Sequence, residues 1–314
     1  MIVEILRGGS VESSHHIEAC VQTPDGKAIF KSGDDFQFYP RSAVKPFQSQ
    51  VLLETGTYKN SDLDLKHLAL AAASHTGETI HTQLVETWLH KLNLSAKDLE
   101  CGSHKPFDLD TYVDCKSKGL APTALHNNCS GKHTGFLNVC CHMKYPTADY
   151  HLAQHPLQQH VKEILQNRLN QELSEFGIDG CSIPAYRMSF HSMAQAYAKM
   201  AQEIAENTLD SSVMVYDAFT QHPYLTSGKN EYCYNVMEKN KGRVLVKEGA
   251  EGVLIAVIPA KKMSIAIKAV DGAERGAQHA SDFLLEKFAG LSPTLSKEMF
   301  NWAGRKVGQV QVRM

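Results

Sequence analysis

The sequence predicts an α+β fold, in which one antiparallel sheet built from both chain ends carries an inserted, mainly helical lobe. Strand-like patterns fill residues 3–38, helical periodicity fills residues 41–221, and short strands return after residue 241. We therefore expect one two-lobed domain over residues 1–314. Its sheet lobe should comprise about 1–40 and 241–314, and its helical lobe about 41–240. We expect a cleft where the two lobes meet, because small-molecule sites usually lie in clefts between lobes.

A β-hairpin is predicted close to the N-terminus. Residues 17–22 and 28–31 have strand-like composition and flank Thr23-Pro24-Asp25-Gly26. Proline fixes φ in such a tetrapeptide and glycine supplies a positive φ, which is the chemistry of a tight turn.

Helices are predicted in the middle of the chain because apolar side chains recur there at helical spacing. Residues 84–92 and 193–204 have this pattern. The clearest stripe consists of apolar residues four positions apart: Leu157, Val161, Leu165, Leu169 and Leu173.

Short strands rich in valine and isoleucine are predicted towards the C-terminus, at residues 244–247, 252–258 and 263–270. Residues 259–262 connect the last two strands as a hairpin. A final helix is expected over about residues 273–288.

The composition indicates a small-molecule protein rather than a polyanion-binding or membrane protein. The formal net charge is -2, which gives no reason to expect a nucleic-acid partner. No apolar stretch reaches membrane-spanning length, and the N-terminus lacks the pattern of a secretory signal. We therefore expect a cytoplasmic location. The eight cysteines have no zinc-finger spacing.

The first candidate for chemistry is the pair Ser42 and Lys45, three residues apart. On a helix, positions i and i+3 share one face. A serine hydroxyl becomes nucleophilic when a base takes its proton, and a lysine amine can be that base. The start of a helix also favours developing negative charge. The alternative reading is a helix N-cap serine followed by a solvated lysine.

Residues 74–78 form a second candidate, in a joint between two predicted helices. Small polar side chains such as Ser74 and His75 could face a cleft there, although the segment also reads as an ordinary helix–helix turn. Lys268 lies in an otherwise apolar strand. It must therefore reach either water or a polar cleft.

A metal site is a further possibility in the residue pattern. Cys129 and Lys132 are three residues apart, and Cys181 lies further along the chain. Two thiolates and a neutral amine could hold Zn²⁺ if these segments meet. Buried cysteines with a surface lysine are the alternative. Asp179 could hold a substrate ammonium group or serve as a turn residue before glycine.

Six short motifs, in order along nearly the whole chain, resemble the rhizobial-type (class 3, asparaginase II) L-asparaginases. The motifs are Arg7-Gly8-Gly9 with Val11-Glu12-Ser13, residues 40–46 around Ser42, residues 74–78, Asn128-Cys129-Ser130-Gly131-Lys132-His133, Asp179-Gly180-Cys181 and Gly249-Ala250-Glu251-Gly252. The resemblance implies a fold similar to the serine β-lactamases and the serine-dependent glutaminases.

The resemblance also implies roles for individual residues. Ser42 and Lys45 would form one serine–lysine pair, and Ser74 and Lys268 a second pair. A zinc ion close to the substrate, orienting it rather than activating water, would be bound by matching residues. Those residues are Cys129, Lys132 and Cys181.

The function that this resemblance implies is hydrolysis of L-asparagine to L-aspartate and ammonia by a homodimer. Arg41, His75, Asn128 and Asp179 are the residues we expect to contact the substrate. Two other readings stay open: a glutaminase or penicillin-recognising hydrolase of the same fold, and a non-catalytic module that binds an amino acid or zinc.

Overall fold

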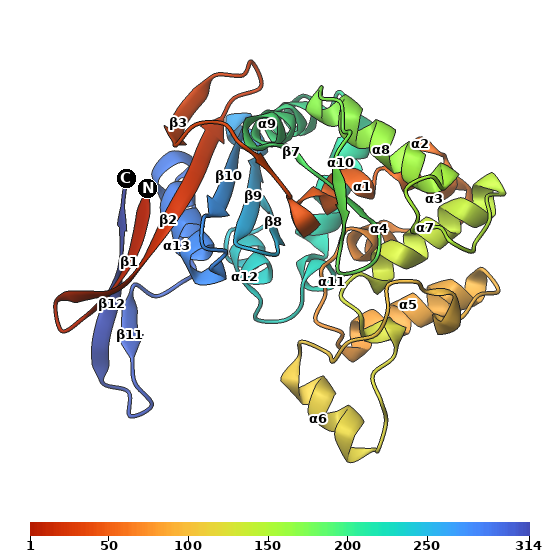
Figure 1. Cartoon of the computed structure of the whole chain (residues 1–314), viewed down its shortest axis with the longest axis horizontal. Helices are drawn as coiled ribbons and strands as arrows, with labels where there is room; N and C mark the ends of the chain where they lie inside the picture. The colour runs from red at the N-terminus through yellow and green to blue at the C-terminus, as the bar shows by residue number, and fades with distance from the viewer. The chain divides into compact units, whose positions relative to one another are not determined.

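The computed structural model describes residues 1–314 and divides into two compact units, each described by itself. Unit 1 comprises Met1–Ala43, Met188–Glu206 and Asn235–Met314. Unit 2 comprises Val44–Arg187 and Asn207–Tyr234. Both ends of the chain contribute strands to unit 1, as the colours of Figure 1 show.

Unit 1 is built on an eight-stranded sheet in the order β11-β12-β1-β2-β10-β9-β8, with β3 beside β2. All of its pairings are antiparallel. The strands are β1 (Ile2–Arg7), β2 (Ser10–Gln22), β3 (Ala28–Ser32), β8 (Leu245–Gly249), β9 (Val253–Ile258), β10 (Met263–Ala269), β11 (Glu298–Phe300) and β12 (Lys306–Arg313). The predicted α+β class, with an antiparallel sheet made from both chain ends, is confirmed.

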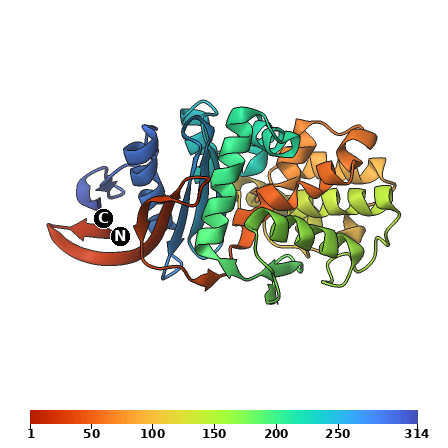
Figure 2. The ribbon, with the colours of Figure 1, turned by 90° about the horizontal axis from the view of Figure 1, so that it is seen from above.

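One helix covers each face of the central strands, α9 (Phe190–Glu206) on one side and α13 (Glu274–Leu284) on the other (Figure 2). The Ser264 hydroxyl of β10 donates to the Ala194 carbonyl of α9 at 2.6 Å. Side chains alternate between faces along a strand, so every second residue of β10 points towards α9. On the other face, Gly276 lets α13 approach β2 closely, because a Cβ there would lie 2.9 Å from the Cβ of His15.

The remaining elements of unit 1 are short. After α13 the chain continues as a π-helical turn, η5 (Leu285–Ala289). The other short elements are η4 (Pro259–Lys261) and the paired strands β4 (Gln37–Phe38) and β7 (Met188–Ser189). The segments η1 (Arg41–Val44) and α12 (Tyr232–Lys239) cross from one unit to the other.

Unit 2 is mainly helical. Its helices are α1 (Lys45–Gln48), α2 (Val51–Glu54), α3 (Thr57–Asn60), α4 (Leu65–Ala71), α5 (Thr79–Lys91), α6 (Leu109–Ser117), α7 (Ser130–Met143), α8 (Pro156–Leu169), α10 (Asp210–Gln221) and α11 (Pro223–Thr226). Two 3-10 turns, η2 (Ala96–Asp98) and η3 (Ala124–His126), and the hairpin of β5 (Phe176–Ile178) and β6 (Pro184–Tyr186) complete it.

The centre of unit 2 is α7, which is buried from Ser130 to Cys140. Two glycines on α7 allow α4 to pack against it. A Cβ on Gly131 would clash with the Leu70 carbonyl, and one on Gly135 would lie 3.3 Å from the Cβ of Ala71. The end of α4, which leads into the Ser74 segment, is therefore held against the start of α7.

Several predicted elements are confirmed. Strands β2 and β3 form the predicted hairpin, and the expected apolar stripe is buried on α8 from Leu157 to Leu169. Its last predicted member, Leu173, is buried but lies beyond the end of the helix. The strands predicted near residues 244–270 are β8, β9 and β10. Two results were not predicted: α9 belongs to the unit that contains the sheet, and β11 and β12 extend that sheet beside β1.

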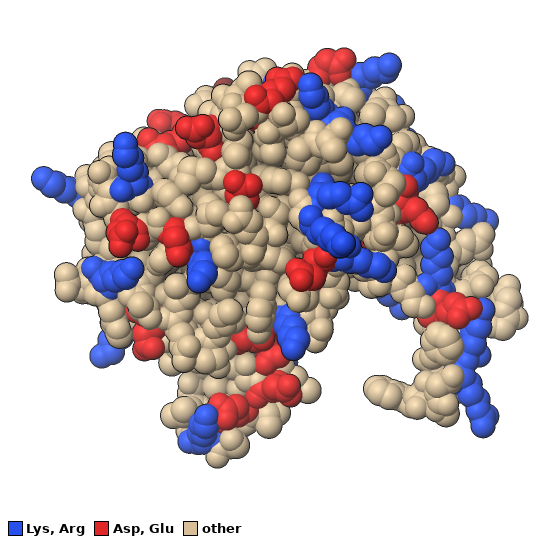
Figure 3. All heavy atoms as spheres, turned by 180° about the vertical axis from the view of Figure 1, so that it is seen from behind, with Lys and Arg blue, Asp and Glu red and all other residues tan.

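No helix of the structure combines the length and apolar character needed to cross a membrane. On the face drawn in Figure 3, basic and acidic side chains are interspersed rather than gathered into one large patch of a single sign.

Candidate active site

The serine and lysine predicted to do the chemistry lie on one short helical segment. Residue Ser42 belongs to the 3-10 turn η1, which runs directly into α1, where Lys45 is the first residue and Pro46 the second. Arg41 precedes them with a φ of 53°. This left-handed conformation is uncommon for a residue with a side chain, and such residues are often found at functional sites.

Two neighbours within unit 1 hold the backbone of Ser42. Gly249, at the end of edge strand β8, approaches so closely that a Cβ would clash with the Pro40 carbonyl and lie 3.3 Å from the Ser42 nitrogen. From α9, the Tyr197 hydroxyl donates to the Ala43 carbonyl at 2.5 Å. The end of β8 and the Tyr197 side chain of α9 therefore hold the backbone of the turn that contains Ser42.

Lys45 lies in unit 2 and is 1% exposed. Its Nζ donates to the Ala73 carbonyl at 2.6 Å, to the Ser74 hydroxyl at 2.9 Å and to the Cys129 sulfur at 3.1 Å. Three acceptors therefore surround the Lys45 amine. The sequence analysis did not predict that Lys45 would bond to Ser74 and Cys129.

The residues predicted to bind zinc come together in unit 2. Cys129 immediately precedes α7 and Lys132 lies in its first turn, whereas Cys181 lies between β5 and β6. The Lys132 Nζ donates to the Cys181 sulfur at 3.1 Å, and the Cys129 thiol donates to the same sulfur. Asp179 Oδ2 is 3.6 Å from that sulfur.

The hydrogen bond between the two cysteines shifts their pKa values in opposite directions. The hydrogen bond from Cys129 lowers the pKa of Cys181 to about 5, against the effect of burial and with help from the charge of Lys132. The same hydrogen bond, together with burial, raises the pKa of Cys129 to about 12. Burial acts to lower the pKa of Lys132, but the charges of the two cysteines and Asp179 outweigh it and raise that pKa. The lowered pKa of Cys181 therefore favours a negative charge on its sulfur, next to the Lys132 amine.

His75, which the resemblance places among the substrate contacts, is fully buried, and both of its ring nitrogens have protein partners. Its Nδ1 accepts from the Gly77 backbone at 3.1 Å, and its Nε2 lies 2.9 Å from the Ser130 hydroxyl. Burial, followed by the charge of the neighbouring His81, keeps the pKa of His75 well below its usual value.

The other expected substrate contacts are half-buried: Arg41, Asn128 and Asp179. Asn128 takes part in the local backbone network. Its carbonyl accepts from the His75 backbone at 3.2 Å, and its N–H donates to His104 Nε2 at 3.0 Å. Asp179 Oδ1 accepts from the Gly180 backbone at 2.9 Å.

The family resemblance implies a second lysine in the site, and two lysines of the sheet are candidates for it. Lys268, on β10, donates to the carbonyls of Glu251, at 2.8 Å, and Ala269. Burial lowers its pKa. Lys247, on β8, is 2% exposed and donates to the Glu248 carbonyl at 2.6 Å. It lies two residues before Gly249 and so shares its face of the sheet.

Sequence reasoning missed Lys247. The available signal was its position in an apolar strand directly before the motif at residues 249–252, which the resemblance already used. Lys268 also lies in an apolar strand, and alternation alone does not say which strand end approaches Ser42.

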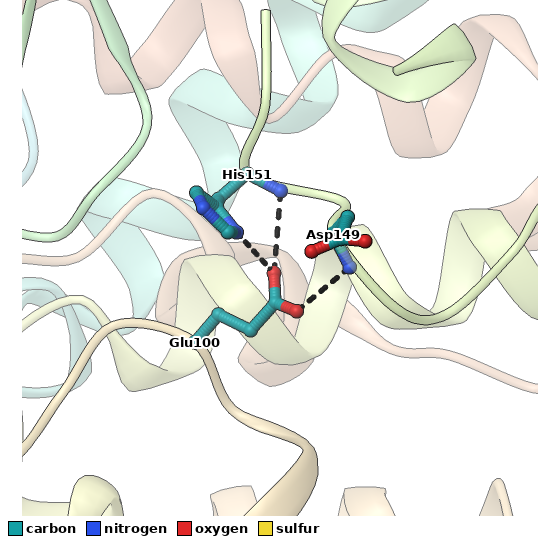
Figure 4. A group of neighbouring side chains, drawn as sticks. All are labelled: Glu100, Asp149 and His151. Carbon is teal, nitrogen blue, oxygen red and sulfur yellow. Dashed lines mark hydrogen bonds and ion pairs between the residues drawn. The ribbon is translucent and has the colours of Figure 1, made fainter.

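A separate group of possible metal ligands lies elsewhere in unit 2 (Figure 4): Glu100, Asp149 and His151. The Glu100 carboxylate accepts from the backbone of Asp149 at 2.8 Å and from His151 Nδ1 at 2.5 Å. The Glu100 carboxylate therefore holds the loop at residues 149–151 through these hydrogen bonds.

Comparison with known proteins assigns the family. The L-asparaginase II family matches residues 3–312. Comparison with curated proteins gives no match. Among solved structures, a β-lactamase from Mycobacterium bovis is 16% identical over 89% of this chain and 95% of its own, with a TM-score of 0.46. A probable glutaminase from Bacillus subtilis, complexed with 6-diazo-5-oxo-L-norleucine, is 15% identical over 90% of this chain and 87% of its own, with a TM-score of 0.41. Because the family match spans nearly the whole sequence, the chain belongs to the L-asparaginase II family and is an amidohydrolase.

Proposed function

We propose that this protein hydrolyses the side-chain amide of L-asparagine through a serine–lysine mechanism. The observation that carries the proposal is the buried Lys45 amine, which hydrogen-bonds Ser74 at 2.9 Å and follows Ser42 by three residues. Because Lys45 is buried, the alternative reading of a solvated surface lysine does not apply to it. Family membership supports asparagine as the substrate.

In the proposed reaction, the Ser42 oxygen attacks the side-chain amide carbon of asparagine. Lys45, as the neutral amine, takes the serine proton directly or through the Ser74 hydroxyl. Backbone N–H groups at the start of the turn stabilise the oxyanion. The C–N bond then breaks, and ammonia leaves with the proton returned by the lysine. Water hydrolyses the resulting β-aspartyl ester and restores Ser42.

Side chains suited to the two charged groups of the substrate are available. Asp179 could pair with the α-ammonium group, and Arg41 could pair with the α-carboxylate through its forked donors. The Asn128 side chain offers both a donor and an acceptor. These three residues are our proposed substrate contacts.

The cysteine cluster fits a zinc ion by its chemistry. Cys129, Cys181 and Lys132 supply two sulfurs and one nitrogen, and the lowered pKa of Cys181 favours the thiolate form that zinc binds. Lys132 would have to lose its proton to act as a ligand. When bound, zinc would supply a fixed positive charge that helps to orient asparagine. Without an ion, the contact between Lys132 and Cys181 keeps the same segments together.

We propose Lys247 as a stronger candidate than Lys268 for the second lysine. Both lysines share the sheet face of Gly249, but Lys247 lies on the same strand, two residues before the glycine that touches the Ser42 segment. Lys247 is also more deeply buried. Lys247→Met should lower kcat at least about tenfold, as expected on loss of a proton-transfer group. Lys268→Met is the matched comparison, with an expected change below about threefold. Steady-state ammonia release measures both, and the opposite order would return the role to Lys268.

The proposed substrate is tested by a side-by-side assay of L-asparagine, L-glutamine and a chromogenic β-lactam. We expect ammonia from asparagine, with kcat/KM for glutamine lower by about tenfold or more. One methylene changes binding by about 1–3 kcal/mol. If the protein prefers glutamine, or turns over only the β-lactam, the proposal that asparagine is the substrate is wrong. Binding of asparagine without ammonia release would indicate a non-catalytic module.

The family resemblance supports a homodimer. We propose a homodimer that acts in the cytoplasm on a small amino acid.

A further inference from the structure

The buried imidazole of His75 joins two segments of the candidate site. On one side it belongs to the loop that follows α4 and carries Ser74. On the other, its Nε2 lies 2.9 Å from the hydroxyl of Ser130, the first residue of α7. Its ring is also stacked on that of His81, with centroids 4.8 Å apart and planes 11° from parallel.

The hydrogen bonds around His75 fix a single tautomer. The Gly77 backbone N–H donates to Nδ1, so Nδ1 carries a lone pair and the proton of the neutral ring is on Nε2. Nε2–H therefore donates to the Ser130 hydroxyl, which in turn donates to the Leu125 carbonyl at 2.9 Å. Both ring nitrogens are occupied, which leaves neither for a substrate or a transferred proton.

Three connections join the loop to the start of α7, and one of them is the backbone bond from the His75 N–H to the Asn128 carbonyl at 3.2 Å. Lys45 forms the first, because its Nζ donates both to Ser74, at 2.9 Å, and to Cys129, at 3.1 Å. His75 and Ser130 form the second, and they are the immediate neighbours of those two residues in sequence. The second connection is the side-chain link closest to the first, and together with the backbone bond it restrains the distance that Lys45 spans.

We infer that His75 is a positioning residue whose bond to Ser130 holds Ser74 and Cys129 where Lys45 can contact both. The inference rests on the proposed function insofar as Lys45 is the base. It differs from the sequence-based expectation that His75 contacts the substrate, and it assigns Ser130 a role of its own.

Three variants test the inference by ammonia release. His75→Gln can keep a donor near the Nε2 position, whereas His75→Asn can keep only an acceptor near Nδ1, and Ser130→Ala removes the other partner. We expect kcat to fall about tenfold to a hundredfold in His75→Asn and Ser130→Ala, because a shift of about 1 Å costs this much. KM should stay within about threefold, and His75→Gln should recover most of kcat. His90→Gln, at an exposed histidine, is the control.

Two outcomes of the assay would overturn the inference. One is a raised KM with unchanged kcat in His75→Asn and Ser130→Ala, which is the signature of lost substrate binding. The other is a His75→Gln enzyme no more active than His75→Asn.

A second measurement keeps the inference separate from the proposed function. Long-range ¹H–¹⁵N spectra of histidine-labelled wild-type protein report the tautomer without any substrate, and the His75 signal is assigned by its loss in His75→Gln. A neutral ring with the proton on Nε2, altered in Ser130→Ala, supports the inference even if the protein releases no ammonia from asparagine. A proton on Nδ1, or a doubly protonated ring, overturns it.

Discussion

Lys45→Met is expected to lower kcat/KM for asparagine by about a thousandfold or more, because a base and its nucleophile act as one unit. Methionine has a similar length and suits the buried site, where Lys45 is 1% exposed. It has no donor for the Ala73 carbonyl or the Cys129 sulfur. Losing a partner of buried polar groups costs about 1–3 kcal/mol, so a small loss of stability should accompany the loss of activity.

The measurement for Lys45→Met is ammonia release together with thermal unfolding. Lys66→Met, at an exposed lysine of α4, is the matched control and should behave like the wild type. A folded Lys45→Met enzyme that keeps more than about a tenth of the wild-type rate would exclude Lys45 as the base.

Ser42→Ala is expected to abolish turnover, with a loss of about a thousandfold or more, because no covalent ester can form. The substitution removes one hydroxyl from a half-buried position, so folding should be unaffected. Ser74→Ala is the matched comparison. As a proton relay, Ser74 should contribute about tenfold to a hundredfold, and Ser74→Ala should keep measurable activity. Equal rates in the wild type and Ser42→Ala would show that Ser42 is not the nucleophile.

Local patterns in the sequence were enough to predict much of the fold. The hairpin of β2 and β3 depends on a four-residue turn, and the stripe on α8 depends on spacing within one helix. Pairing between distant segments left no such signal. Strand β12 pairs with β1 from the opposite end of the chain, β11 lies outside β12, and much of β12 is exposed.

In the candidate site, too, local motifs identified residues but not the contacts between distant segments. The motifs located Ser42, Lys45, Cys129, Lys132 and Cys181, and the structure brings the last four together in unit 2. Spacing along the chain could not show that Lys45 also bonds to a residue 29 positions away, Ser74.

Burial decided two further points that residue types alone could not. His75 has the composition of a substrate contact, yet no part of it is exposed. Lys247 and Lys268 both interrupt apolar strands, and Lys247 is the more deeply buried of the two and lies on the strand whose Gly249 contacts the Ser42 segment.

The most direct test of the serine–lysine account is to map the adduct left by a diazoketone analogue of asparagine. The analogue carries a reactive carbon in place of the amide, so it should alkylate the attacking oxygen. Peptide mass spectrometry should find the adduct on Ser42 in the wild type, with none in Ser42→Ala. An adduct on Ser74, or an enzyme that releases ammonia from asparagine but forms no serine adduct, would contradict the account.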